Sequence, residues 1–183
     1  MSFIGIFGKM KGAVLNVIKE ELENSNISEN EAINEFKKGK LFEDYVKSKF
    51  SKRYFSVEYQ TPSYEDNQTG FINASNRPDF TLKYMPKGIY FSVECKYRSN
   101  LYKGKYNWTK KKQMDRYKQF MEEEGHPVFI VMGLGGEPNN PEKMYCVPLK
   151  DIKYVGLYPS FLDPYERDLD KFFFLDPIKI MLR

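Results

Sequence analysis

The sequence predicts an α/β fold in which a mixed central β-sheet is flanked by helices. Helical patterns come first, three alternating strand-like runs follow, and a further helix precedes two more strands. Such an order buries its apolar faces most simply as layers around one sheet. A length of 183 residues suits one ordinary domain, so residues 1–183 are expected to form a single domain.

Two helices are expected before the first strand. Apolar residues at helical spacing over 9 to 23 predict an amphipathic helix within residues 1–27. Ser28 and Glu31 have the spacing of a capping box for a second helix, in which Gly39 is a candidate break.

Strands and one further helix follow. The helix is predicted over 109 to 124, and residues 150–183 are read as a C-terminal extension with an irregular course and one short element. Alternating or continuously apolar runs predict five strands, at 54 to 61, 79 to 84, 89 to 97, 127 to 133 and 143 to 148.

The composition excludes several classes of protein. No run approaches the roughly 18 apolar residues of a membrane span, and the N-terminus does not read as a signal peptide, so a cytoplasmic protein without a membrane partner is expected. Cys95 and Cys146 lie in separate strand-like runs and should be reduced. A single histidine, His126, rules out His-built metal sites and Ser-His-Asp triads. Any chemistry must come from carboxylates, lysine and a bound metal.

The stretch Met-Pro-Lys-Gly at 85 to 88 predicts a turn between two paired strands. If they pair without a bulge, paired residue numbers sum to 173 and Asp79 faces Glu94. Two opposed carboxylates repel one another, so a cation is expected between them, and Mg²⁺ prefers such oxygen ligands. Lys96 shares the face of Glu94 and could orient or deprotonate a water, or stabilise charge on a phosphate. The alternative is that Lys96 is only a counter-charge.

A basic, aromatic segment follows the second of these strands. Between residues 96 and 118, nine Lys or Arg stand against one acid, Asp115. Cations interleaved with aromatic rings are typical of nucleic-acid surfaces, although a solvated helix face would look similar. The predicted nucleic-acid contacts are Arg98, Lys103, Lys105, Trp108, Lys110, Lys111, Lys112, Arg116 and Tyr117.

Over about residues 39 to 134 the sequence resembles the PD-(D/E)XK nucleases, the restriction-endonuclease-like superfamily. The resemblance lies in Pro78-Asp79 followed by Glu94-Cys95-Lys96, in Glu43 within Gly-Lys-Leu-Phe-Glu-Asp-Tyr-Val, and in the pair Gln113 and Tyr117. That pair matches the Q-x-x-x-Y element of the RecB-like branch, and a Holliday-junction-resolvase-like branch is the other candidate. Glu43 could instead form an ordinary helical pair with Lys47.

The resemblance implies a restriction-endonuclease-like sandwich and a Mg²⁺-dependent nuclease, with Mn²⁺ as a substitute and DNA as the expected substrate. The implied metal ligands are Asp79, Glu94, Glu43 and the backbone carbonyl of Cys95, and the implied catalytic residues also include Lys96 and Gln113. A homodimer is compatible with cutting two strands. The alternatives are a non-cleaving nucleic-acid-binding module on the same fold and a structural domain whose charges are only surface features. The sequence does not distinguish endonuclease from exonuclease, or one biological role from another.

Overall fold

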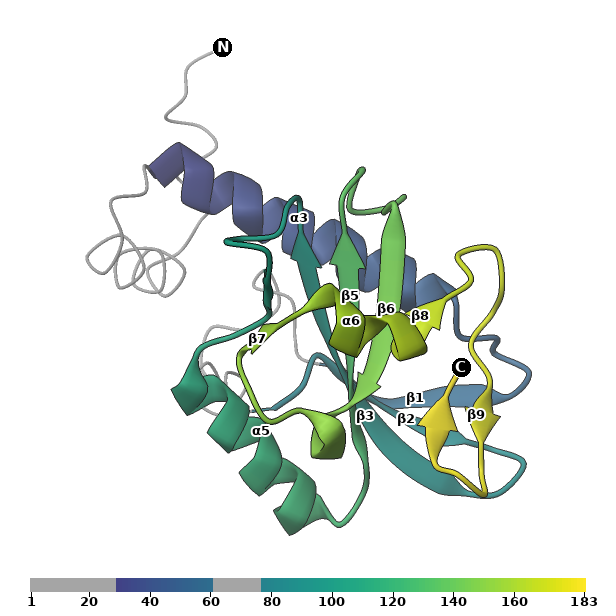
Figure 1. Ribbon diagram of the computed structural model, residues 1–183. Coiled ribbons are helices and arrows are strands. Elements are labelled where there is room, and N and C mark those ends of the chain that lie inside the picture. The colour runs from purple at the N-terminus through teal and green to yellow at the C-terminus, as the bar shows by residue number, and fades with distance from the viewer. Residues whose placement is uncertain (1–28, 61–76) are drawn as a thin grey trace.

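A computed structural model describes residues 29–60 and 77–183 (Figure 1). The helix predicted within residues 1–27 and the Ser28 cap lie outside these residues. No helix in the part that is described is long and apolar enough to cross a membrane.

The core of the fold is a six-stranded mixed sheet with the order β1-β2-β3-β5-β6-β8. Neighbouring strands are antiparallel except β3 and β5, which are parallel and joined through α5. The strands of this sheet are β1 (Phe55–Gln60), β2 (Phe80–Tyr84), β3 (Ile89–Arg98), β5 (Val128–Leu134), β6 (Lys143–Pro148) and β8 (Glu166–Arg167). The α/β class with a mixed sheet flanked by helices is therefore confirmed, and so are the five predicted strands.

The β2–β3 hairpin has the predicted register. Phe80 pairs with Val93 and Tyr84 pairs with Ile89, so the paired numbers sum to 173 without a bulge. Gly88 has a φ of 65°, a backbone conformation that favours glycine, and it closes the turn. One face of the hairpin is buried in an apolar cluster, while the other carries the polar residues Thr81, Ser92, Glu94 and Lys96.

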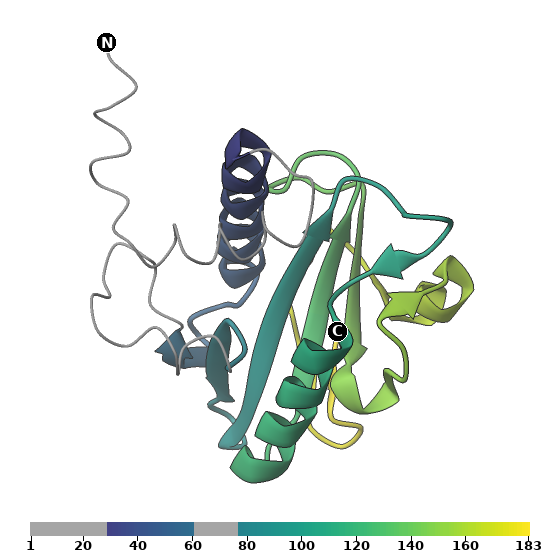
Figure 2. The same ribbon diagram turned by 90° about the vertical axis from the view of Figure 1, so that its left-hand side faces the viewer.

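Helix α3 (Glu29–Ser48) covers the apolar face of the hairpin, and helix α5 (Lys111–Glu124) covers the opposite face of the sheet (Figure 2). Phe42 and Val46 of α3 belong to the first cluster, whereas Met114 of α5 belongs to the second. Both faces of β3 and β5 are therefore buried, as is usual for parallel strands. The predicted break at Gly39 is wrong, because α3 continues through it.

Residues 150–183 complete both apolar clusters. Ile152, Leu157 and Leu162 belong to the second cluster, and Phe173 and Leu175 belong to the first. The other short elements are β4 (Tyr106–Asn107) and β7 (Gly156–Leu157), which pair, β9 (Leu175–Asp176) and β10 (Met181–Leu182), which also pair, α6 (Pro159–Leu162), and the 3-10 turns Leu149–Asp151 and Asp163–Tyr165. The segment predicted to be mostly irregular thus contributes an edge strand to the main sheet, the pair β9 and β10, and the strand β7 that pairs with β4.

Gly133 of β5 allows α3 to approach the sheet. A Cβ at this position would lie 2.5 Å from Cε2 of Phe42, which is fully buried next to Glu43. We expect Gly133→Ala to lower the free energy of unfolding by about 1–3 kcal/mol through overpacking. Gly39→Ala is the control, because nothing lies within 4 Å of a Cβ there, and it should raise stability by up to about 1 kcal/mol. Urea denaturation of both variants tests this, and equal effects would contradict it.

Candidate active site

Asp79 immediately precedes β2. It lies beside the part of β3 that extends beyond the last pair of the hairpin, Phe80 and Val93. Its Oδ2 accepts a hydrogen bond of 2.6 Å from the backbone N–H of Cys95. The carboxylate thus satisfies a strand N–H that β2 does not reach. In an extended strand the N–H and C=O of one residue point to the same side, so the Cys95 carbonyl is also directed toward Asp79. The thiol of Cys95 is buried in the first cluster, and both cysteines are free.

Glu94 is the most deeply buried acid of the site, with an exposed fraction of 1%. Its Oε1 forms an ion pair with Nζ of Lys96, and its Oε2 is buried without a hydrogen-bond partner among the described residues. A buried carboxylate oxygen without a partner is costly to the fold. The buried carboxylate of Glu94 is therefore a group that the stability of the fold alone does not favour.

Glu43 reaches the same site from α3, the helix on the other side of the sheet. It pairs with Lys40 at 3.0 Å, while Lys47 donates a hydrogen bond to Gln60 instead. The alternative Glu43–Lys47 pair is therefore not formed. Burial raises the pKa of Glu43, and the charge of Glu94 raises it further against the opposing effect of Lys40.

The electrostatics of Asp79 show that the predicted acids and lysine act on one another. Burial raises the pKa of Asp79 well above its ordinary value, and the charges of Glu94 and Glu43 raise it further. Lys96 and the Cys95 N–H act in the opposite direction. Burial alone would lower the pKa of Lys96, but the charges of Glu94 and Asp79 outweigh this effect and raise it. Lys96 is therefore a cation at neutral pH.

Gln113 and Tyr117 lie one turn apart on α5, above the same face of the sheet. Nε2 of Gln113 donates a hydrogen bond of 2.7 Å to the hydroxyl of Tyr117. Burial raises the pKa of Tyr117, and the charges of Glu94 and Asp79 raise it further. The two side chains thus border the acidic cluster, with Tyr117 in a neutral, hydrogen-bonding form.

Two of the predicted nucleic-acid contacts have buried rings. Trp108 and Tyr117 are buried in the second cluster, where their rings stack at 6.4 Å, so neither ring can stack on a base at the surface. Their apolar area is needed to fill the space between α5 and the sheet. The guanidinium of Arg98 is also engaged, because it donates to the carbonyls of Asn107 and Tyr97 and holds the chain after β3.

The remaining basic residues of this segment differ in how far their side chains are exposed for contact with a nucleic acid. Lys103, Lys110, Lys111 and Lys112 are exposed, and Lys111 pairs with Asp115 on the same helix. Lys105 and Arg116 are half-buried.

Exposed tyrosines that the sequence analysis did not single out lie beside this segment. Because β4 pairs with β7, the chain around residues 154 to 158 is brought next to Lys105. Nζ of Lys105 lies 4.7 Å from the ring centroid of Tyr158, and Tyr154 is 72% exposed. No local pattern could have identified them, because they are about 50 positions away in the sequence.

The carboxylates of this site are oxygen ligands of the kind that hard divalent cations bind. No group of three or more His, Cys, Asp or Glu side chains in the described parts of the chain has the arrangement of a metal cage. Mg²⁺ does not require one, because it usually keeps several waters and binds through one or two carboxylates. Oε2 of Glu94 has no hydrogen-bond partner in the described part of the chain, and the charges of Glu94 and Glu43 disfavour the ionised form of Asp79. Both observations fit a site that a divalent cation would stabilise.

Comparisons with known proteins give a likeness in backbone structure and none in sequence. No family model matches the chain, and no curated protein is similar to it in sequence. A solved structure with a similar backbone is a Holliday junction resolvase from Archaeoglobus fulgidus, an archaeal hyperthermophile, with a TM-score of 0.48 and 15% identity over 69% of this chain and 93% of that chain. A likeness at this level carries no information about residue roles, so the function must be inferred from the side chains.

Proposed function

We propose that the chain is a Mg²⁺-dependent nuclease that hydrolyses phosphodiester bonds in DNA. The observation that carries this proposal is the convergence of Asp79, Glu94 and Lys96. There a buried carboxylate oxygen that no residue in 29–60 or 77–183 satisfies lies beside a lysine held in its charged form. The same residues carry the resemblance to the PD-(D/E)XK nucleases. A non-cleaving module would have no need to retain this combination at a cost to stability.

Asp79, Glu94 and the Cys95 carbonyl would hold the metal ion, with Glu43 completing or supporting the site. A bound divalent ion supplies Lewis-acid polarisation of the phosphate and activation of the attacking water. The carboxylates of this chain supply the negative charge that attracts the ion.

Lys96 would act as a cation rather than as a base. Because its pKa is raised, its ammonium group has no free lone pair at neutral pH. It can donate hydrogen bonds to the attacking water or to the phosphate, where negative charge increases in the transition state. A charged lysine cannot deprotonate the water, so of the roles that the sequence left open we propose that Lys96 orients the water or stabilises charge on the phosphate.

The start of α5 would bind the phosphate backbone. Lys110, Lys111 and Lys112 stand at the helix N-terminus, whose first turn contains no acid. Positive charges are unfavourable there, because the N-terminal end of the helix dipole is itself positive. Lysines at this end reduce helix stability, but they form a strong attraction for a phosphate together with the free N–H groups of the first turn.

Replacing Lys110, Lys111 and Lys112 by alanine should weaken DNA binding and reduce its dependence on salt. Each lost phosphate contact should lower the slope of log affinity against log salt by about 0.9, so a total reduction of about 1 to 3 is expected. The matched control replaces Lys52, Lys87 and Lys179, three exposed lysines outside the segment. Fluorescence anisotropy at several salt concentrations measures both proteins. The same slope in both variants would place the DNA surface elsewhere.

The direct test of the function is cleavage. Purified protein should be incubated with linear, nicked, branched and circular DNA, with and without Mg²⁺ or Mn²⁺. Metal-dependent cutting that is lost in Glu94→Gln supports the nuclease. Tight DNA binding without cutting under any of these conditions would favour the non-cleaving module.

A further inference from the structure

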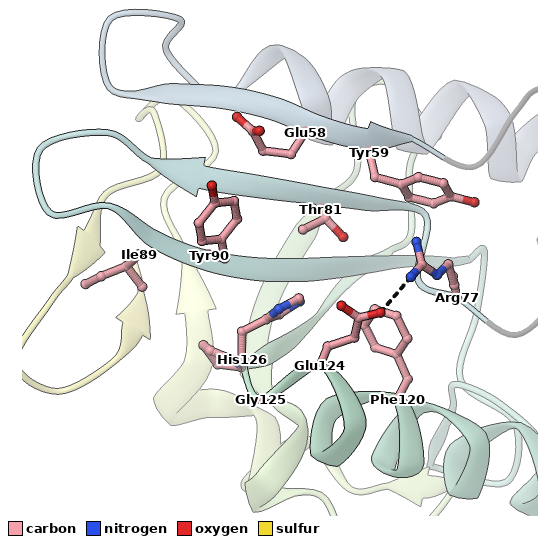
Figure 3. A pocket seen from close by; sticks show the side chains of 11 residues that line it. Glu58, Tyr59, Arg77, Thr81, Ile89, Tyr90, Phe120, Glu124, Gly125 and His126 are labelled. Atoms are coloured by element: carbon pink, nitrogen blue, oxygen red, sulfur yellow. Dashed lines mark hydrogen bonds and ion pairs between the residues drawn. The ribbon is translucent and has the colours of Figure 1, made fainter.

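A pocket of about 550 Å³ is formed by β1, β2, β3 and the end of α5 (Figure 3). Thr81 and Tyr90 line it from the polar face of the hairpin, the face that also carries Glu94. Tyr90, which lines the pocket, is four positions before Glu94 on the same face of β3 and thus about 13 Å from it along the strand. A single strand that runs from the candidate active site along β3 would therefore reach the pocket within a few nucleotides.

Three aromatic rings line the pocket, from Tyr59, Tyr90 and Phe120. Tyr59 faces it because of a β-bulge: Val57 pairs with Leu82, but Tyr59 pairs with Thr81. If the strand alternated regularly and Glu58 paired with Thr81, Tyr59 would lie on the same face as Val57. The bulge therefore moves one aromatic ring from the apolar side of the sheet into the pocket.

Hydrogen-bonding groups with fixed positions lie between these rings. Oγ of Ser92 is 2.7 Å from Oγ1 of Thr81 and 2.8 Å from Nε2 of His126. Burial lowers the pKa of His126, so its ring is neutral at neutral pH and can donate or accept. Arg77 pairs with Glu124 at 2.6 Å and lies over the rings of Tyr59 and Phe120.

The charges of the pocket select the chemistry of its ligand. Glu58 and Glu124 line it together with Arg77, whose charge is already paired, so a phosphate has no net attraction here. A flat, uncharged ligand with donors and acceptors along its edge fits the rings and the hydroxyl groups. Nζ of Lys83 lies 5.1 Å from the Tyr90 ring centroid, where it could contact a phosphate outside the pocket. A nucleobase joined to a phosphodiester backbone meets all of these requirements.

We propose that this pocket receives one unpaired base of the nucleic-acid substrate, within a few nucleotides of the phosphodiester bond that is cut. This inference rests on the proposed nuclease function and adds to it a preference for DNA that is single-stranded, or locally unpaired, near the cleavage site. Tyr90 would provide the stacking surface, and Thr81 would hydrogen-bond to the edge of the base. A base in a regular duplex could not enter without being unstacked.

The test measures binding in EDTA, so that cleavage does not interfere. The ligands are a single-stranded oligonucleotide, the same sequence in a duplex, the single strand with one abasic position, and free dAMP. The proteins are wild type, Tyr90→Ala, Thr81→Val and the matched control Tyr54→Ala. Tyr54 suits this purpose because its exposed fraction, 43%, is close to the 42% of Tyr90, and it does not line the pocket.

Loss of one stacking contact should weaken single-strand binding by Tyr90→Ala about 5- to 100-fold, with a smaller loss for Thr81→Val. Duplex binding should be unchanged, and Tyr54→Ala should match wild type with every ligand. An abasic position that removes the difference between wild type and Tyr90→Ala would identify the base in the pocket.

Equal losses on single strand and duplex, or no loss in Tyr90→Ala, would overturn the proposal for the pocket. Binding of dAMP as tight as that of the oligonucleotide would also overturn it, in favour of an independent mononucleotide site. These outcomes leave the nuclease intact if wild type binds and cuts DNA. A wild-type protein that neither binds nor cuts would instead contradict the proposed function itself.

Discussion

Lys96→Gln should lower the DNA cleavage rate by about 10²- to 10³-fold while DNA affinity changes little. The variant retains a hydrogen-bond donor of similar length but loses the positive charge that the phosphate needs in the transition state. DNA affinity should persist because the exposed lysines of the segment after β3 remain. Single-turnover cleavage and anisotropy separate the two effects.

The Mg²⁺ affinity of Lys96→Gln should not fall along with its cleavage rate. Lys96 and the metal ion compete for the charge of Glu94, so Lys96→Gln should bind Mg²⁺ as tightly as wild type or more tightly. Without metal the variant should also be less stable, because a buried carboxylate has lost its counter-charge, and added Mg²⁺ should restore part of that loss. Lys40→Gln is the control, since Lys40 pairs with Glu43 and Asp44 at the edge of the site. Wild-type cleavage by Lys96→Gln would show that this lysine is only a structural counter-charge.

Asp79→Asn should abolish metal-dependent cleavage and yet make the metal-free protein more stable, by about 0.5–2 kcal/mol at neutral pH. The raised pKa means that the folded protein disfavours the ionised carboxylate more than the unfolded chain does. Asparagine removes the charge but retains an oxygen that can accept the hydrogen bond from Cys95. Thermal denaturation with and without Mg²⁺ measures both parts of this prediction.

The gain in stability from Asp79→Asn should depend on pH. As the pH falls through the raised pKa of Asp79 toward its ordinary value of 3.8, the folded wild type takes up a proton before the unfolded chain does. The destabilising effect of the ionised carboxyl group is therefore lost progressively in that window, and the difference in stability between wild type and Asp79→Asn should become smaller. Asp44→Asn is the control, because its side chain is 59% exposed on α3. An Asn variant that is less stable than wild type at neutral pH would contradict the view that Asp79 is retained for function.

The sequence by itself determined the hairpin and the polar face on which the candidate site stands. The side-chain period of a strand is two, so the alternation from Phe80 to Tyr84 and from Phe91 to Tyr97 permits a single register in which both apolar sets share one face. That register carries Glu94 and Lys96 to the opposite face. Local periodicity was sufficient because strand and turn lie within 20 residues.

The sequence could not decide which residues of the basic segment are exposed. Its lysines and aromatic rings alternate irregularly, and composition alone does not distinguish a ring that stacks on a base from one that fills the core. Trp108 and Tyr117 are buried because α5 packs against β5 and residues 150–183 close over the same cluster. These contacts join segments that are distant in the chain, so only tertiary structure places them.

Tertiary structure also decided the chemical state of the site and the shape of its surroundings. The pKa shifts of Asp79 and Lys96 depend on burial and on Glu94 together, and burial is a property of the packed fold. The one-residue bulge at Glu58 could not be recognised from the alternating pattern of the strand, yet it directs the Tyr59 side chain toward the pocket. The sequence specified which groups the site contains, through short-range spacing, whereas long-range packing set their charges, their exposure and the space beside them.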